Sequence, residues 1–214
     1  VQPQSETVWR QATKYRVPRI AFVNKMDRTG ANFDNALNDM RKKLGAYAYP
    51  VGIPLGREDY LKGVIDVVNQ KAIIYDESDE AGLKYEVAEI PDDHKEMAKA
   101  ALAELIDAVS NKDDAIAELV IEEKPITPEI LKAAIRRLTC KIEFIPVLGG
   151  SAFKKRNVQF LVDAVVDYLP GPLDVPAAEG EVPGESDKRV TAPTDDNAKF
   201  CSLAFKLWTD PFVG

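Results

Sequence analysis

Apolar residues recur at helical spacing on both sides of a short apolar run near the N-terminus. Residues 5–15 are predicted to form a helix with Ser5 as its N-cap. The run at residues 19–24 is bounded by turn residues, which is typical of a buried parallel strand. A second amphipathic helix is predicted over residues 32–44, and Gly45 is placed to end it in a left-handed conformation. This order of helix, strand and helix predicts an α/β fold.

The middle of the chain combines short β-rich segments with helices. The β-rich segments lie at residues 47–55, 63–68 and 71–75. The helices are predicted at residues 92–110, 113–121 and 127–138. We expect the β-rich segments to form a small sheet of their own. An apolar strand at residues 143–148 and a helix at residues 158–168 then repeat the earlier order of strand, loop and helix.

The C-terminal part changes character twice. Residues 171–198 are rich in Pro and Gly and have no apolar period, so they are predicted to be a linker. From Cys201 onward apolar and polar residues alternate, which predicts a strand. We interpret residues 199–214 as the start of a second, β-rich domain.

Composition narrows the class of protein. With 214 residues and 45% hydrophobic residues, the chain has enough apolar surface for an ordinary core. It has no long apolar run and no signal-peptide pattern, so we expect a cytoplasmic protein without a membrane partner. Two cysteines and one histidine exclude a disulfide framework and a zinc site of N and S ligands, and we predict no metal ligands in the chain.

The net charge of −7 is unevenly distributed. Residues 72–123 hold 16 acidic and 4 basic residues, a net charge of −12. Such an acidic chain does not wrap nucleic acid nonspecifically, although a local basic contact is compatible with it.

The clearest chemical signal is Asn24-Lys25-Met26-Asp27, which directly follows the first predicted strand. Loops at this position bind ligands in α/β folds. A carboxylate such as Asp27 accepts both the ring N–H and the exocyclic amine of guanine, a donor pair that adenine does not present. Asn24 can donate to the base N7 and brace the neighbouring loop, while the methylenes of Lys25 cover the ring. The alternative interpretation is a polar turn after a strand.

A second loop strengthens the first signal. Gly150-Ser151-Ala152 follows the second apolar strand, at the matching end if the two strands are parallel neighbours. Small residues there let the backbone N–H groups of Ser151 and Ala152 approach guanine O6. Taken alone, this loop could be a simple tight turn. The two loops together predict a site for GTP or GDP.

The two loops are part of a wider resemblance. The chain resembles bacterial elongation factor G essentially from end to end. The matching strings lie at residues 1–12, 24–33, 150–154, 165–170, 203–206 and 210–214. The resemblance implies a translational GTPase that moves tRNA and mRNA on the ribosome. It also implies that the acidic middle is an insert facing the stalk proteins of the large ribosomal subunit, with ribosomal RNA as a further partner of the whole protein. Glu104 and Asp107 are candidates for that docking patch, and a merely solvated helix face is the alternative.

The departures from the family pattern are informative. A GTPase of this class needs a Gly-x-x-x-x-Gly-Lys-Ser/Thr loop for the phosphates and Mg²⁺, and the chain has none. It also lacks the switch segments and the Asp-x-Pro-Gly-His element, and its single histidine, His94, lies in the acidic segment. We therefore expect a fragment that recognises guanine, holds no catalytic residue and is inactive by itself.

The resulting prediction is a partial P-loop-type GTPase domain with an inserted α+β subdomain. The predicted divisions are a partial G domain at 1–44, the insert at 45–138, the rest of the G domain at 139–170, a linker at 171–198 and the first strand of a β-barrel domain at 199–214. Two other interpretations stay open. One is a translational GTPase of the ribosome-protection or release-factor recycling type, and the other is a stand-alone, non-catalytic interaction module.

Overall fold

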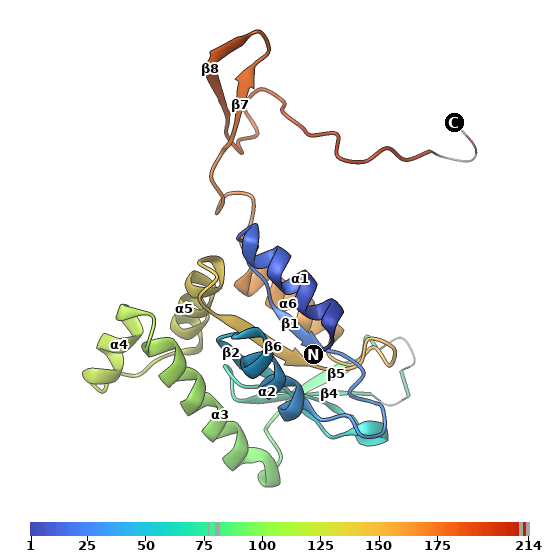
Figure 1. The fold of residues 1–214 in the computed structure, drawn as a ribbon. Helices are drawn as coiled ribbons and strands as arrows, with labels where there is room; N and C mark the ends of the chain where they lie inside the picture. The colour runs from blue at the N-terminus through green and yellow to red at the C-terminus, as the bar shows by residue number, and fades with distance from the viewer. Residues whose placement is uncertain (77, 80–81, 210–211, 213–214) are drawn as a thin grey trace. The chain divides into compact units, whose positions relative to one another are not determined.

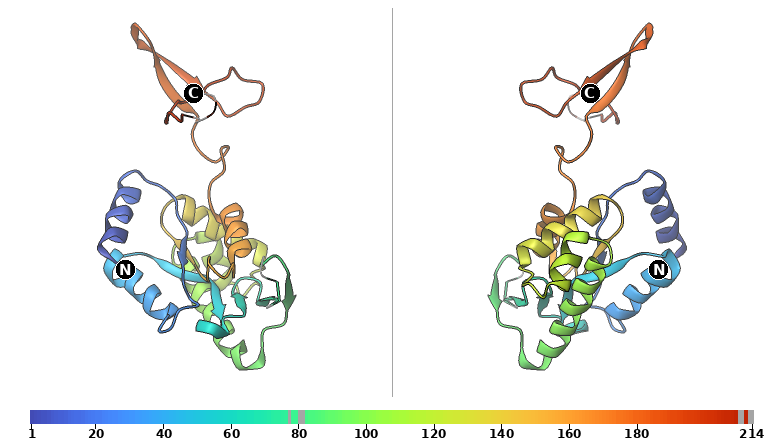
Figure 2. Two further views of the ribbon diagram at one scale, coloured as in Figure 1. Left: turned by 90° about the vertical axis from the view of Figure 1, so that its right-hand side faces the viewer. Right: turned by 90° about the vertical axis from the view of Figure 1, so that its left-hand side faces the viewer.

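The computed structural model describes residues 1–76, 78–79, 82–209 and 212. The chain divides into two compact units, Val1–Leu169 and Pro170–Gly214. Figures 1 and 2 show the ribbon from three directions. The chemistry predicted from the sequence lies in the first unit.

The first unit alternates helices and strands along the chain. It begins with α1 (Pro3–Lys14), β1 (Ala21–Val23) and α2 (Phe33–Leu44). Next come β2 (Ala48–Leu55), the one-turn 3₁₀ helix η1 (Glu58–Tyr60), β3 (Gly63–Asp66), β4 (Lys71–Tyr75) and β5 (Tyr85–Ala88). The remaining elements are α3 (Asp92–Ser110), α4 (Asp114–Ile121), α5 (Pro128–Cys140), β6 (Ile145–Gly149) and α6 (Val158–Tyr168).

One mixed sheet runs through the first unit. In the described residues its six strands have the order β1-β6-β2-β3-β4-β5. β6 is parallel to both β1 and β2, whereas the pairs β2–β3, β3–β4 and β4–β5 are antiparallel. The predicted parallel pairing of the two apolar strands is confirmed, and so is the α/β fold class.

The expected separate small sheet is wrong. β2 pairs with β6 on one side, with Ala48 opposite Ile145, and with β3 on the other. It therefore joins the segment around residues 47–75 to the strands that carry the two loops. The sequence pattern shows that β2 is a strand, but it does not show which strand pairs with it, because that choice depends on residues far along the chain.

Helices cover both faces of the sheet. Alternate side chains along β6 pack against different helices. Ile145 and Val147 belong to a buried cluster with α2. Phe144 and Leu148 belong to another cluster, with α3, α4, α5 and α6. Successive side chains of a strand point to opposite faces, so β6 is buried on both sides. A strand buried on both faces holds its following loop in a fixed place.

Local capping explains where α2 begins and ends. The Asn32 side chain accepts a hydrogen bond from Asn35 N–H at 2.8 Å, and Gly45 ends the helix with φ of 60°. These bounds match the prediction. At α1 the prediction of Ser5 as N-cap is wrong, because the helix already begins at Pro3, where the missing N–H of proline has no cost. In the described part of the chain, no helix combines the length and apolarity needed to cross a bilayer.

The second unit departs from the sequence prediction. Its hairpin of β7 (Ala178–Val182) and β8 (Glu185–Ala192) lies within the predicted linker, so the expectation of irregular structure is wrong there. Pro183 and Gly184 form the turn, with a φ of 85° at Gly184, and such residues suit a hairpin as well as a linker.

The strand predicted from Cys201 is also wrong, because residues 200–209 form neither a helix nor a strand. Phe205 and Leu207 are 88% and 94% exposed. An alternating pattern forms a strand only when a neighbouring strand supplies hydrogen bonds. Residues 210–211 and 213–214, which belong to the expected start of a second domain, lie outside the described residues.

Candidate functional site

Two loops meet at the carboxyl ends of β1 and β6. We call residues 24–30 the first loop and residues 150–157 the second loop. Val23 lies opposite Gly149 in the parallel ladder. Gly150 N–H donates to Val23 C=O, and Met26 N–H donates to Gly150 C=O, both at 3.0 Å. The ladder thus continues beyond the strands and holds the loops side by side, where α/β sheets bind ligands.

Asn24 ties the first loop to the second. Its Oδ1 accepts hydrogen bonds from the backbone N–H groups of Lys25, at 2.8 Å, and of Ala152, at 3.0 Å. Asn24 was predicted to brace the neighbouring loop, and its bond to Ala152 N–H is such a contact. It brings together two predicted site residues that are far apart in the sequence.

Asp27 carries a buried acceptor without a partner. Its Oδ1 is shielded from solvent and accepts no hydrogen bond from the described residues. A buried polar atom left unsatisfied costs about 1–3 kcal/mol, and more when it is charged. Native proteins rarely keep such an atom without a reason. A ligand that donates N–H groups would satisfy it.

Lys25 lies between these two residues with its backbone in the left-handed region, at a φ of 65°. This conformation costs a non-glycine residue about 1–2 kcal/mol. Its side chain is exposed. Backbone strain of this kind is concentrated at binding sites, where the surrounding structure holds it in place.

The second loop is a tight turn closed on itself. Ser151 is fully buried, and its Oγ accepts a hydrogen bond from Lys154 N–H at 3.1 Å. Ser151 and Arg156 exchange two backbone hydrogen bonds, at 3.1 and 2.8 Å. A Cβ at position 150 would lie 2.6 Å from Arg156 C=O, so only glycine fits there.

The amides predicted to approach guanine O6 already have acceptors. Ser151 N–H donates to Arg156 C=O, and Ala152 N–H donates to Asn24 Oδ1. Only the second of these bonds lies between the loops. A base oxygen would therefore have to share the Ala152 N–H with Asn24.

Asn157, at the end of the second loop, is a further candidate site residue that the sequence pattern does not reveal. Its buried Nδ2 donates to Gly149 C=O at 2.5 Å and to Gly63 C=O at 3.3 Å, which fixes the second loop to β6 and β3. An Asn before a helix is ordinarily predicted to cap it. Here the side chain makes no cap. Nothing in the local sequence distinguishes the two uses.

The comparisons with known proteins agree with this geometry. Residues 1–171 match the sequence model described as the elongation factor Tu GTP binding domain. The chain belongs to this family. A solved structure from Thermus thermophilus, that of ttk003000868, is 27% identical with a TM-score of 0.71. The match covers 80% of this chain and 25% of the Thermus chain, so the chain spans about a quarter of that protein's length.

Membership of the elongation factor Tu GTP binding domain family establishes the coarse function. Domains of this family belong to translational GTPases and bind guanine nucleotides. Both loops lie inside the matched residues, whereas the β7–β8 hairpin lies outside them. The domain that binds guanine nucleotides in this family therefore includes both loops.

The remaining predicted site residues lie on α3. Glu104 Oε1 forms an ion pair with Arg41 Nη2 of α2 at 3.0 Å. Asp107 Oδ2 lies 3.4 Å from Nδ2 of Asn111, the residue that caps the C-terminal end of α3. Neither of these contacts reaches the first or the second loop. Glu104 remains 53% exposed, so it is in contact with both α2 and solvent.

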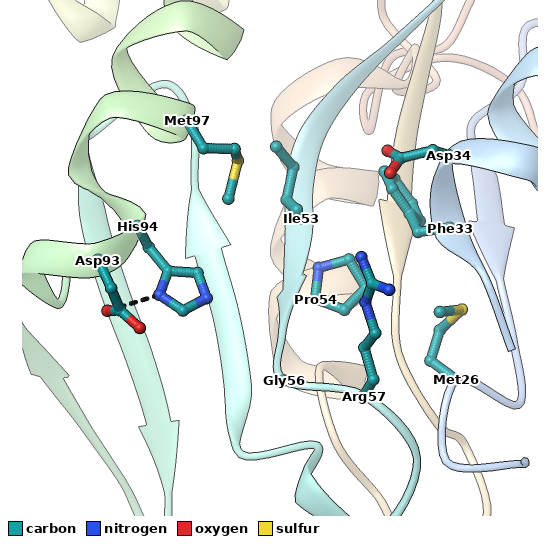
Figure 3. Close-up of a pocket in the computed structure, with 10 residues that line it drawn as sticks. All are labelled: Met26, Phe33, Asp34, Ile53, Pro54, Gly56, Arg57, Asp93, His94 and Met97. Carbon is teal, nitrogen blue, oxygen red and sulfur yellow. Dashed lines mark ion pairs between the residues drawn. The ribbon is translucent and has the colours of Figure 1, made fainter.

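A cavity of about 390 Å³ lies beside the first loop. Figure 3 shows His94 and Met97 on the α3 side of the cavity and Met26 and Phe33 on the other side, with Arg57 between them. His94 Nδ1 lies 2.8 Å from Asp93 Oδ1. The same cavity therefore borders α3 and Met26, the buried residue of the first loop.

Proposed function

We propose that the two loops bind the guanine base of GTP and GDP. The observation that supports this is the buried, unpartnered Asp27 Oδ1 next to the bond between Asn24 and Ala152. The Asp27 carboxylate would accept hydrogen bonds from the guanine ring N–H and the 2-amino group together. Two charge-assisted bonds of this kind are specific for guanine and absent for adenine. The Asn24 amide would donate to N7, and the Lys25 methylenes would cover one face of the ring.

The second loop would recognise the other edge of the base. Guanine O6 would accept the Ala152 N–H, which Asn24 Oδ1 would then share. Ser151 would act indirectly, because its buried hydroxyl holds the turn through Lys154 N–H. The geometry of this turn depends on glycine at position 150, where a side chain would collide with Arg156 C=O.

The residues present fit the base and not the phosphates. The sequence has no Gly-x-x-x-x-Gly-Lys-Ser/Thr string. In the described residues no group of three or more His, Cys, Asp or Glu is placed to hold a metal. Phosphate contacts and Mg²⁺ would therefore depend on residues other than these 214, and the chain by itself would not hydrolyse GTP.

The whole protein we propose is an elongation factor G-type translocase, which moves tRNA and mRNA on the ribosome in the cytoplasm. The end-to-end likeness of the sequence strings supports it, together with membership of the GTP binding domain family. Residues 45–138 would be the insert that meets the stalk proteins, with Glu104 and Asp107 in its docking patch. Residues 199–214 would begin the next domain.

The Asp27→Asn variant tests the guanine site in the full-length GTPase that contains this chain. An amide in place of the carboxylate donates to a C2 carbonyl and no longer accepts two N–H groups. We expect GDP affinity to fall by roughly tenfold or more, which corresponds to about 1.5–3 kcal/mol. Xanthosine diphosphate, which carries a C2 carbonyl, should gain affinity. Calorimetric titration with both nucleotides measures the switch.

Asp34→Asn provides the matched control, because Asp34 lies at the start of α2 outside both loops. This variant should change both affinities by no more than roughly twofold. Equal GDP affinity for Asp27→Asn and the unmodified protein would remove Asp27 from base recognition.

A further inference from the structure

A short segment between β2 and β3 lies against the first loop. We call residues 56–60 the brace. They include η1, and the sequence pattern indicates no role for them. We propose that Glu58 in the brace is a positioning residue that holds Asp27 in the geometry required for guanine; this rests on the proposed guanine site.

Glu58 forms two hydrogen bonds to the first loop. Its backbone N–H donates to Met26 C=O at 3.0 Å. Its side-chain Oε1 accepts a hydrogen bond from Gly30 N–H at 2.7 Å. Met26 directly precedes Asp27, and Gly30 closes the same loop. One residue therefore restrains the backbone on both sides of the base-reading carboxylate.

The brace has a defined shape of its own. Gly56 has a φ of 91°, and a Cβ there would lie 1.9 Å from Tyr60 C=O. Glu58 is itself left-handed, with a φ of 54°. A glutamate in this region is strained by about 1–2 kcal/mol. The two bonds to the first loop give a physical reason for this strain.

Neighbouring residues anchor the brace to the rest of the site. Asp59 Oδ1 lies 3.2 Å from Lys154 Nζ of the second loop, although this exposed pair contributes little energy. Leu61, just after the brace, is buried in the same cluster as Met26. Arg57 lines the cavity beside Met26 (Figure 3). The brace thus contacts both loops, with Glu58 making the hydrogen bonds to the first.

Guanine recognition is sensitive to this restraint. Asp27 has to present two oxygens to two donors at once, and such a bidentate contact tolerates little displacement. The left-handed backbone at Lys25 gives the first loop a tendency to relax. Without the carboxylate of Glu58, the Gly30 N–H loses its hydrogen bond, and this end of the first loop is no longer held in place. The contact to the 2-amino group should weaken first, and preference for guanine should decline.

The experiment compares GDP with inosine diphosphate, which lacks the 2-amino group, in the 214-residue chain at millimolar nucleotide by NMR titration. The unmodified chain should prefer GDP by roughly tenfold, the value of one charge-assisted hydrogen bond. Glu58→Ala should reduce the preference to about twofold or less. Glu58→Gln should keep most of it, since its amide oxygen still accepts from Gly30 N–H. Glu143→Ala, at the other end of β6, is the control and should keep the full preference.

The outcomes separate this proposal from the one it rests on. Full GDP preference in Glu58→Ala would overturn the role of Glu58 and leave the guanine site standing. An equal loss in the Ala and Gln variants would also overturn it, because a carboxylate acting through Gly30 predicts rescue by Gln. A chain that never distinguishes GDP from inosine diphosphate would contradict the guanine site itself. Faster hydrogen exchange at the Gly30 amide in Glu58→Ala alone supports the proposed contact.

Discussion

Asp113 joins two helices through a single carboxylate. It accepts a hydrogen bond from Ile116 N–H at 3.2 Å as the N-cap of α4. Arg137 of α5 donates to the same carboxylate from Nε at 3.0 Å and Nη2 at 2.9 Å. Burial raises the pKa of Asp113, but the hydrogen bonds from Arg137 and the Ile116 amide outweigh burial, so the pKa lies below its ordinary value of 3.8.

This lowered pKa gives a pH-dependent prediction. A carboxyl group with a lower pKa in the folded state stabilises the fold above its unfolded pKa and loses this effect as pH falls through the folded value. Asp113→Asn keeps a cap and removes the charge, so it should destabilise by about 1–2 kcal/mol at pH 7. The difference should shrink below about pH 4. Urea unfolding over a pH series measures it.

The control is Asp114→Asn at the neighbouring position. Asp114 is exposed, and Arg137 forms its ion pair with Asp113. This control variant should cost no more than about 0.5 kcal/mol. A loss of stability in Asp113→Asn that is the same at every pH would show that the charge of Asp113 does not matter.

The candidate site residues differ in whether the local sequence reveals them. Asn24 and Asp27 could be predicted, because a motif directly after a strand is visible in the sequence. Glu58 and Asn157 could not, because their partners are backbone groups of distant segments, at Gly30 and Gly63. Hydrogen bonds to backbone leave no side-chain pattern that a single sequence reveals.

Among the secondary-structure elements too, features that depend on nearby residues could be predicted, and features that depend on distant residues could not. The bounds of α2 follow from Asn32 and Gly45, which act within one or two turns of their own helix. The pairing of β2 with β6 depends on residues far apart, and the separate sheet was wrongly expected for that reason. The alternation after Cys201 likewise predicts a strand, yet in the described residues no strand pairs with residues 200–209.

One helix, α3, carries the proposed stalk contact and can be tested as an element. In the full-length GTPase, Glu104→Lys with Asp107→Lys should slow stalk-stimulated GTP turnover roughly three- to tenfold and weaken its salt dependence. Long-range attraction between an acidic face and a basic partner sets the association rate, whereas nucleotide affinity should stay unchanged. Turnover measured over a series of salt concentrations provides the readout.

Glu118→Lys with Glu122→Lys introduces the same change of charge on and just after α4. This control should leave stalk stimulation nearly intact if the patch on α3 is specific. Unchanged stimulation in the α3 variant would assign Glu104 and Asp107 to a solvated face, and equal slowing in both variants would point to net charge alone.

For the whole molecule, the proposed site would recognise the base of GTP, and the sequence has no Gly-x-x-x-x-Gly-Lys-Ser/Thr string for its phosphates. Most of the binding free energy of GTP comes from its phosphates and Mg²⁺. We therefore expect the isolated chain to bind GTP no better than about millimolar, some 4 kcal/mol, and to show no turnover. Calorimetric titration with GTP and Mg²⁺ decides this. A micromolar dissociation constant or measurable hydrolysis would mean that the chain holds phosphates by means we have not recognised.

The position of β6 between β1 and β2 determines when the sheet is able to form. Both partners of β6 precede it by roughly a hundred residues or more, and such distant pairings make folding slow. During synthesis, β1 and β2 therefore wait with open edges until β6 leaves the ribosome, whereas α3, α4 and α5 form from local contacts. The first and second loops, which follow β1 and β6, are consequently among the last parts of the first unit to assemble. The unpaired strand edges must therefore stay protected until β6 is in place.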